Sequence, residues 1–232
     1  MNEKVKLSVV LLTYNRGGSA YLKQALDAIL NQTYSEFELL VMDNHSDDNT
    51  SEFVLSYHDP RMTYVRQPPG GNASSNYLTA LWMSRGKYIV LTHDDDVMDP
   101  EMLSKQMTFI DGHPDILCLG TNVKLIDEHD GTIQDRLYDF EEDQVFEEVE
   151  YIRAYLGEKL WMPTPTLLFN REAHISLLRN MVRESKTKIK YESSGDIWLL
   201  FLLNLKGQVG MLKDPLLSYR QHPGQESRNV DQ

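Results

Sequence analysis

The stretch LSVVLLTYNR at residues 7–16 sets the pattern for the first half of the chain. Residues 7–12 have the length and the apolar composition of a buried strand, and polar residues follow at once. From Leu22 to Leu30, apolar residues recur at i, i+3, i+4, i+7 and i+8, as on one face of an amphipathic helix. Residues 37–42 form a second apolar run of strand length. This order predicts two parallel strands joined by a helix.

The same alternation continues to about residue 120. Gly86 stands where a helix C-cap glycine is usual, and Pro100 opens a further predicted helix. The later predicted elements are a helix at 49–57, strands at 62–66 and 88–92, and a strand that begins at 116–119. We therefore predict an α/β fold with a mostly parallel, doubly wound sheet and helices on both faces. In such folds, ligands bind at the carboxyl ends of the strands.

The second half of the chain is less regular. Residues 127–143 are acidic and rich in turn formers, and residues 161–165 contain two prolines that predict an extended backbone. The predicted helices here are 147–156, 171–182 and 196–206. No linker composition separates the halves, so we interpret residues 1–232 as a single domain.

The composition excludes several classes of protein. The chain has 23 Lys and Arg against 35 Asp and Glu, and the resulting net charge of −12 argues against non-specific binding to nucleic acid. A single cysteine, Cys118, favours a reducing compartment. No segment approaches the ~18–20 apolar residues of a membrane span. We expect a cytoplasmic protein, and contact of the basic stretch 183–190 with the inner face of the membrane stays open.

Three carboxylates, Asp94, Asp95 and Asp96, follow the predicted strand at 88–92 and His93. Carboxylates this close at a buried strand end repel one another and lose hydration, which costs free energy unless a cation offsets their charge. Oxygen ligands suit a hard ion such as Mg²⁺ or Mn²⁺. The alternative is an acidic loop that caps the next helix. The residues alone leave both interpretations open.

Two further polar segments follow predicted strands. They are TYN at residues 13–15 and DNHS at residues 43–46. A tyrosine at a strand end can stack on a base, and Asn or Asp can hydrogen-bond a base or a ribose. These residue types are equally common in turns and N-caps. The sequence contains neither a G-x-G-x-x-G fingerprint nor a Walker A motif, which weakens a dinucleotide or ATP interpretation.

The three segments together resemble family 2 glycosyltransferases, and within them the spore-coat polysaccharide type. The residues at 7–16 look like the first strand and loop of that family, and residues 41–46 look like its second strand end. The resemblance covers residues 5–125 well and continues in islands at 195–196 and 219–223. It implies the GT-A fold and an inverting, metal-dependent sugar transfer to an acceptor hydroxyl in polysaccharide or cell-surface glycan synthesis.

The resemblance also implies a role for each matching residue. Asp196 is implied as the general base. The implied metal ligands, for Mg²⁺ or Mn²⁺, are Asp95, Asp96 and His222. The implied donor-binding residues are Thr13, Tyr14, Asn15, Asp43, Asn44, Asp94 and Arg220. Arg220 and His222 are expected on a flexible C-terminal loop.

The same resemblance implies partners and a division of labour. The donor is a nucleotide-diphosphate sugar, with UDP as the expected nucleotide, and the acceptor is a saccharide or a lipid-linked molecule. Residues 1–125 form the nucleotide-sugar-binding half, and residues 126–232 form the acceptor half with a C-terminal lid. The chain departs from the family at Asn44, where an acidic residue is common, and at His93, which replaces the first Asp of a longer acidic signature.

Two other functions stay open at this point. A nucleotidyltransferase would also use a doubly wound sheet and carboxylate-held metal, but the segment from Thr13 to Gly18 offers only Arg16 to hold a triphosphate. A binding module that has lost turnover would retain the donor site. Without the resemblance, Asp196 is better explained as the N-cap of the helix that follows it than as a base.

Overall fold

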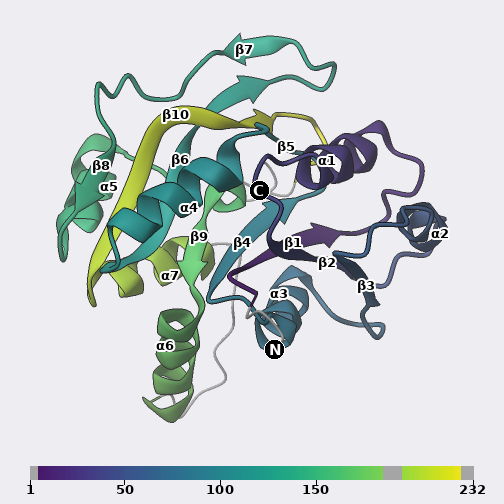
Figure 1. Cartoon of the computed structure of the whole chain (residues 1–232), viewed down its shortest axis with the longest axis horizontal. Coiled ribbons are helices and arrows are strands. Elements are labelled where there is room, and N and C mark those ends of the chain that lie inside the picture. Colours follow the sequence, from purple (N-terminus) through teal and green to yellow (C-terminus); the bar gives the residue numbers. More distant parts are fainter. Residues whose placement is uncertain (1–4, 185–194, 226–232) are drawn as a thin grey trace.

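The computed structural model describes the backbone of residues 5–184 and 195–225, and the side chains of residues 5–180 and 197–225. The described strands form one ten-stranded sheet that spans the molecule (Figure 1). Its order is β3-β2-β1-β4-β9-β6-β10-β5, with β7 paired to β6 and β8 paired to β10. The strands are β1 (Leu7–Thr13), β2 (Phe37–Asp43), β3 (Met62–Arg66), β4 (Tyr88–His93), β5 (Val97–Met98), β6 (Ile116–Ile126), β7 (Thr132–Gln134), β8 (Gln144–Phe146), β9 (Leu168–Asn170) and β10 (Gln208–Arg220).

The first four strands are parallel, as the sequence predicts. Pairing of β1 with β2 sets Thr13 beside Asp43, and pairing of β1 with β4 sets Leu12 beside His93. The carboxyl ends of the three strands therefore meet at one edge of the sheet. The residues that follow them lie close together as a result.

Beyond β4 the sheet is mixed, which corrects the prediction of a mostly parallel sheet for this half. The short strand β9 lies antiparallel between β4 and β6. The long strand β10 runs parallel to β6, with register shifts on both sides of Pro215, and antiparallel to β5. Strands from both halves of the chain thus alternate in one sheet, which supports our proposal of a single domain over residues 1–232.

Helices cover both faces of the sheet, as predicted. One core cluster joins α1 (Ala20–Leu30), α2 (Thr50–Leu55) and α4 (Met102–Gly112) to the face of β1 that carries Val9 and Leu11. The other joins α3 (Ala73–Met83), α5 (Glu150–Glu158), α6 (Arg171–Glu184) and α7 (Gly195–Asn204) to the face that carries Val10. Burial on both faces explains why β1 is a continuous apolar run.

Two local predictions were wrong. Gly86 is not a helix cap, because α3 ends at Met83 and its C-cap is Ser84. A Cβ at Gly86 would lie 2.6 Å from the backbone nitrogen of Ser8, so this glycine permits close approach of the chain to β1. Residues 161–165 are not extended throughout, because a 3₁₀ turn covers Thr164–Thr166 with Pro165 in its first turn.

The described helices include none that is both long enough and apolar enough to cross a membrane. The basic stretch at 183–190 lies almost entirely outside the described residues, as does the C-terminal segment from residue 226.

Candidate active site

Asp94 lies at the carboxyl end of β4 and is held by the loop that follows β1. Its Oδ2 accepts hydrogen bonds from Thr13 Oγ1 at 2.7 Å and from the backbone N–H of Tyr14 at 3.4 Å. Its Oδ1 accepts a hydrogen bond from Arg16 Nε at 3.2 Å. Burial raises the pKa of Asp94, while the charge of Arg16 and the Thr13 hydroxyl oppose that rise. Thr13 is buried and its hydroxyl donates to Asp94, so Thr13 positions this carboxylate.

Asp95 lies between a histidine and two arginines. Its Oδ2 is 2.9 Å from His222 Nε2 and 3.8 Å from the terminal nitrogen NH2 of Arg16. Its backbone carbonyl accepts a hydrogen bond from Arg220 Nε at 2.8 Å. The side chain of Asp95 is 12% exposed, so it can reach a ligand at the surface of the site.

Asp96 carries an unsatisfied buried carboxylate oxygen. Its Oδ1 accepts a hydrogen bond from the backbone N–H of Arg220 at 2.9 Å. Its Oδ2 has no hydrogen-bond partner among the described residues, and His93 Nδ1 is 4.0 Å away. Burial and the neighbouring charge of Asp95 raise the pKa of Asp96 well above its ordinary value. An orphaned buried oxygen of this kind is costly unless something outside the protein binds it.

One group of possible metal-ligating side chains occurs in the described part of the chain. It contains His93, Asp95 and Asp96, whose ligand atoms can all lie within 4.8 Å of one another. Two carboxylates and one imidazole fit a divalent cation such as Mn²⁺. His222, which the resemblance places among the ligands, contacts Asp95 but is not part of this group.

Arg220 is not on a flexible loop, contrary to the prediction. It ends β10, and its side chain is fully buried. Its guanidinium stacks 4.4 Å from the centre of the Tyr21 ring. It donates hydrogen bonds to the carbonyls of Asp95 and Asp127, to Asp130 Oδ1 and to Gln24 Oε1. These contacts leave the Arg220 guanidinium little capacity to bind a donor diphosphate. Arg220 instead holds the acidic segment, residues 94–96, in place through Asp95 and Asp96.

Tyr14 and Asn44, which are expected to bind the base, differ in their exposure. Tyr14 is 52% exposed beside the acidic segment. Asn44 Oδ1 is buried and has no hydrogen-bond partner among the described residues, and Gly71 lies beside it, because a Cβ there would be 3.1 Å away. Tyr14 is therefore accessible to a base, and Asn44 Oδ1 is a buried acceptor without a partner in the described structure.

The side chains of Asp43 and Asn15 instead accept hydrogen bonds from other residues of the protein. The buried carboxylate of Asp43 accepts hydrogen bonds from Ser46 and from the Tyr64 hydroxyl. Asn15 Oδ1 accepts the backbone N–H of Asp47 at 2.9 Å. These two residues tie together the loops after β1 and β2, and their direct contact with the donor stays a prediction.

Sequence reasoning gave no role to several residues of this site. The sequence gives Arg16 no role in the donor or metal site, and it marks His93 only as a departure from the family. The supports of Arg220 are Tyr21 and Gln24 on α1 and Asp130 in the turn between β6 and β7. Gln24 gave no signal, because its partner is 196 residues away in the sequence.

Asp196 is predicted to lie just before the helix, whereas it is the second residue of α7, and its side chain lies outside the described residues. Its helix is anchored by Leu199, Leu200 and Leu203, which are buried in the core. Of the expected C-terminal lid, residues 226–229 lie outside the described residues.

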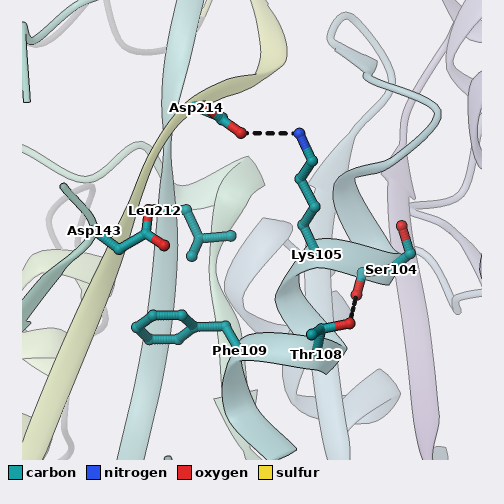
Figure 2. Close-up of a pocket in the computed structure, with 7 residues that line it drawn as sticks. All are labelled: Ser104, Lys105, Thr108, Phe109, Asp143, Leu212 and Asp214. Atoms are coloured by element: carbon teal, nitrogen blue, oxygen red, sulfur yellow. Dashed lines mark hydrogen bonds and ion pairs between the residues drawn. The ribbon is translucent and has the colours of Figure 1, made fainter. Parts of the chain in front are cut away.

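A separate cavity of about 290 Å³ lies between α4 and β10. Figure 2 shows Lys105 reaching from α4 toward Asp214, and their charged groups are 2.9 Å apart. The cavity is lined by Ser104, Lys105, Thr108, Phe109, Asp143, Leu212 and Asp214. It contains none of the residues that the sequence singles out.

An acidic segment, residues 94–96, thus lies at the end of β4 beside the loops after β1 and β2, and comparison with known proteins shows the family. Residues 8–178 match the model of glycosyl transferase family 2, and the chain belongs to this family. The uncharacterized glycosyltransferase MJ1057 of Methanocaldococcus jannaschii is 28% identical over 229 residues, which are 94% of this chain and 71% of that protein.

Two solved structures share the fold, and the predicted GT-A fold is confirmed. S. aureus TarS (residues 1–349) in complex with UDP-GlcNAc aligns with a TM-score of 0.71 at 20% identity, over 97% of this chain and 61% of that one. The mannosyltransferase PcManGT of Pyrobaculum calidifontis, in complex with GDP-Man and Mn²⁺, aligns with a TM-score of 0.70 at 16% identity. That alignment covers 99% of this chain and 61% of PcManGT.

Proposed function

We propose that this chain is an inverting glycosyltransferase that moves a sugar from a nucleoside-diphosphate donor to an acceptor hydroxyl with the help of Mg²⁺ or Mn²⁺. The single observation that supports this best is the unpartnered Oδ2 of buried Asp96 beside Asp95 and His93. Its place at the carboxyl end of β4 is where a doubly wound sheet binds its ligand. Family membership supports the reaction class.

In this proposal the donor nucleotide lies across the ends of β1, β2 and β4. Tyr14 stacks on the base, and the Asn44 amide, with one acceptor and two donors, hydrogen-bonds its edge. UDP is the expected nucleotide, and TarS with UDP-GlcNAc supports it. PcManGT binds GDP-Man, so the base is a point for experiment.

Asp95, Asp96 and His93 would hold the cation in this proposal, and His222 and Arg220 would fix Asp95 in place. A bound divalent cation supplies Lewis-acid stabilisation for the charge that develops on the departing nucleoside diphosphate. Asp94, fixed by Thr13, is the residue we assign to the donor ribose.

Asp196 is the proposed general base. A carboxylate at the start of a helix is stabilised in its ionised form by the helix dipole, and a base must be ionised at neutral pH. Attack by the acceptor hydroxyl from the face opposite the leaving group inverts the anomeric carbon. Inversion in a transferase needs one catalytic carboxylate, whereas a glycosidase needs two. The proposed acceptor is a saccharide or a lipid-linked saccharide.

No observation favours a nucleotidyltransferase. Such an enzyme needs several cations after β1 to hold a triphosphate, and residues 13–18 contain one, Arg16. A panel of UDP-, GDP-, CMP- and dTDP-sugars with Mn²⁺ tests the proposal. Release of a nucleoside diphosphate from one donor, lost in Asp95→Ala, is the expected result. Release of pyrophosphate from a nucleoside triphosphate and a sugar phosphate would contradict it.

A further inference from the structure

Two guanidinium groups reach the acidic segment, and they are held in different ways. The side chain of Arg220 is fully buried and is fixed by Tyr21, Gln24 and Asp130 in addition to Asp95. The Arg16 side chain is 27% exposed. Its polar contacts in the described structure are one hydrogen bond to Asp94 at 3.2 Å and one long ion pair with Asp95 at 3.8 Å. Of the two cations, Arg16 is the one that can leave without disrupting the core.

The loop that carries Arg16 does not need the Arg16 side chain to hold its shape. The backbone N–H of Arg16 donates to Thr50 Oγ1 at 2.9 Å, and that of Gly17 donates to Asp48 Oδ2 at 2.9 Å. The backbone N–H of Asn15 donates to Ser46 Oγ at 2.8 Å. These backbone hydrogen bonds therefore set the loop conformation, and the Arg16 guanidinium can move without changing it.

The charged groups around Arg16 indicate the role of its guanidinium. Arg16 partly neutralises Asp94 and Asp95, while Oδ2 of Asp96 remains without a partner. A divalent cation on Asp95 and Asp96 would repel the guanidinium that already contacts Asp95. The cation must therefore displace Arg16 or share its carboxylates with it.

We propose that Arg16 is the resident counter-cation of the metal site: it weakens binding of a bare divalent cation, and it turns toward the donor diphosphate when the cation and the nucleotide bind together. This inference rests on the proposed function. It follows that the cation binds with the nucleotide rather than before it. Arg16 is thus a positioning residue that sets the order of binding.

Binding of Mn²⁺ alone tests the proposal without any turnover. Mn²⁺ is titrated into the full chain and the free ion is measured by electron paramagnetic resonance. We expect Arg16→Gln to bind Mn²⁺ roughly tenfold more tightly than the parent, since removal of one adjacent positive charge lowers the cost of binding a cation. Arg16→Lys keeps the charge and should stay within about threefold of the parent. Arg179→Gln removes a charge from an exposed site on α6 and is the matched control.

The same variants also report on the diphosphate. With saturating Mn²⁺, Arg16→Gln should bind UDP several-fold more weakly than the parent, because the guanidinium no longer reaches the phosphates. Circular dichroism checks folding, and Arg16→Met, which keeps the apolar stem, replaces Arg16→Gln if that variant unfolds.

The outcomes separate this inference from the proposed function. Unchanged or weaker Mn²⁺ binding in Arg16→Gln, or equal tightening in Arg16→Lys, would overturn the counter-cation role while Mn²⁺-dependent binding of UDP by the parent still supports the metal site. If neither the parent nor any variant binds Mn²⁺ with or without UDP or GDP, the metal site itself is refuted and this inference with it.

Discussion

Arg220 Nε donates a hydrogen bond to the backbone carbonyl of Asp95 over 2.8 Å, although the two residues are 125 positions apart in the sequence. The backbone N–H of the same arginine donates to Asp96 Oδ1. The last residue of β10 thus fixes two members of the acidic segment at the end of β4. This support fits the proposed role of the two carboxylates as metal ligands, because it fixes them before a cation binds.

We expect Arg220→Met to destabilise the protein by about 3 kcal/mol, because it leaves the backbone carbonyl of buried Asp95 without its charged donor and removes the hydrogen bonds to Asp127, Asp130 and Gln24. Urea unfolding followed by circular dichroism measures the loss. Arg179→Met, at an exposed position, is the control and should change stability by less than about 0.5 kcal/mol. A similar small loss for Arg220→Met would show that its contacts are not needed for the fold.

Tyr14→Ala should weaken nucleotide binding roughly tenfold and leave the unfolding temperature unchanged, since stacking on a base contributes about 1–3 kcal/mol and the ring is exposed. Calorimetric titration with UDP in Mn²⁺ measures the affinity. Trp82→Ala removes an equally exposed ring from α3 and should bind UDP like the parent. Equal affinity of Tyr14→Ala and the parent for every nucleoside diphosphate would remove Tyr14 from the donor site.

Asp196→Asn should lower sugar transfer by at least ~10²-fold and keep donor affinity within a few-fold, because it retains size and capping ability but loses basicity. Turnover with the true acceptor and titration with the donor are the two measurements. Near-parental transfer would mean that Asp196 only stabilises the N-terminus of α7 and that the base lies elsewhere. If Asp196→Asn unfolds, Asp196→Ser, which also caps, takes its place.

His174 should make the protein sensitive to acid. Burial lowers the pKa of His174 to about 3, and its Nδ1 is 3.0 Å from the Tyr77 hydroxyl. Between that value and its ordinary pKa of about 6.5, the unfolded chain binds the proton and the folded chain does not, so stability falls as the pH falls.

The measurement compares the parent with His174→Asn, which keeps a polar atom near Nδ1. From about pH 6 to about pH 4, the parent should lose about 2 kcal/mol more unfolding free energy than the variant. Parallel losses in the two proteins would mean that His174 is already protonated when folded or is not buried in solution.

Much of the first half of this fold could be predicted from the sequence, because β1, β2 and β4 are buried on both faces and so appear as unbroken apolar runs. The acidic segment could be located for the same reason, since it follows one of these runs. Strand β9 could not be predicted, because it has three residues and depends on pairing with β4 and β6.

The contacts through which β10 and Arg220 hold the acidic segment were the hardest part of the site to predict from the sequence. Strand β10 contains Pro215 and shifts register there, so no period of two marks it. The burial of Arg220 depends on partners on α1 and in the turn between β6 and β7, none of which is near it in sequence. Its polar surroundings suggested an exposed tail, whereas ion pairing and hydrogen bonds allow full burial.

The most direct test of a metal-dependent nucleotide site is calorimetric titration of UDP and GDP into the parent and Asp95→Ala, each in Mn²⁺ and in EDTA. We predict that the parent binds one of the two nucleotides at least tenfold more tightly in Mn²⁺ than in EDTA, and that Asp95→Ala loses this difference while its affinity in EDTA stays close to that of the parent. Equal affinities of Asp95→Ala and the parent in Mn²⁺ would contradict the assignment of the acidic segment as the metal site.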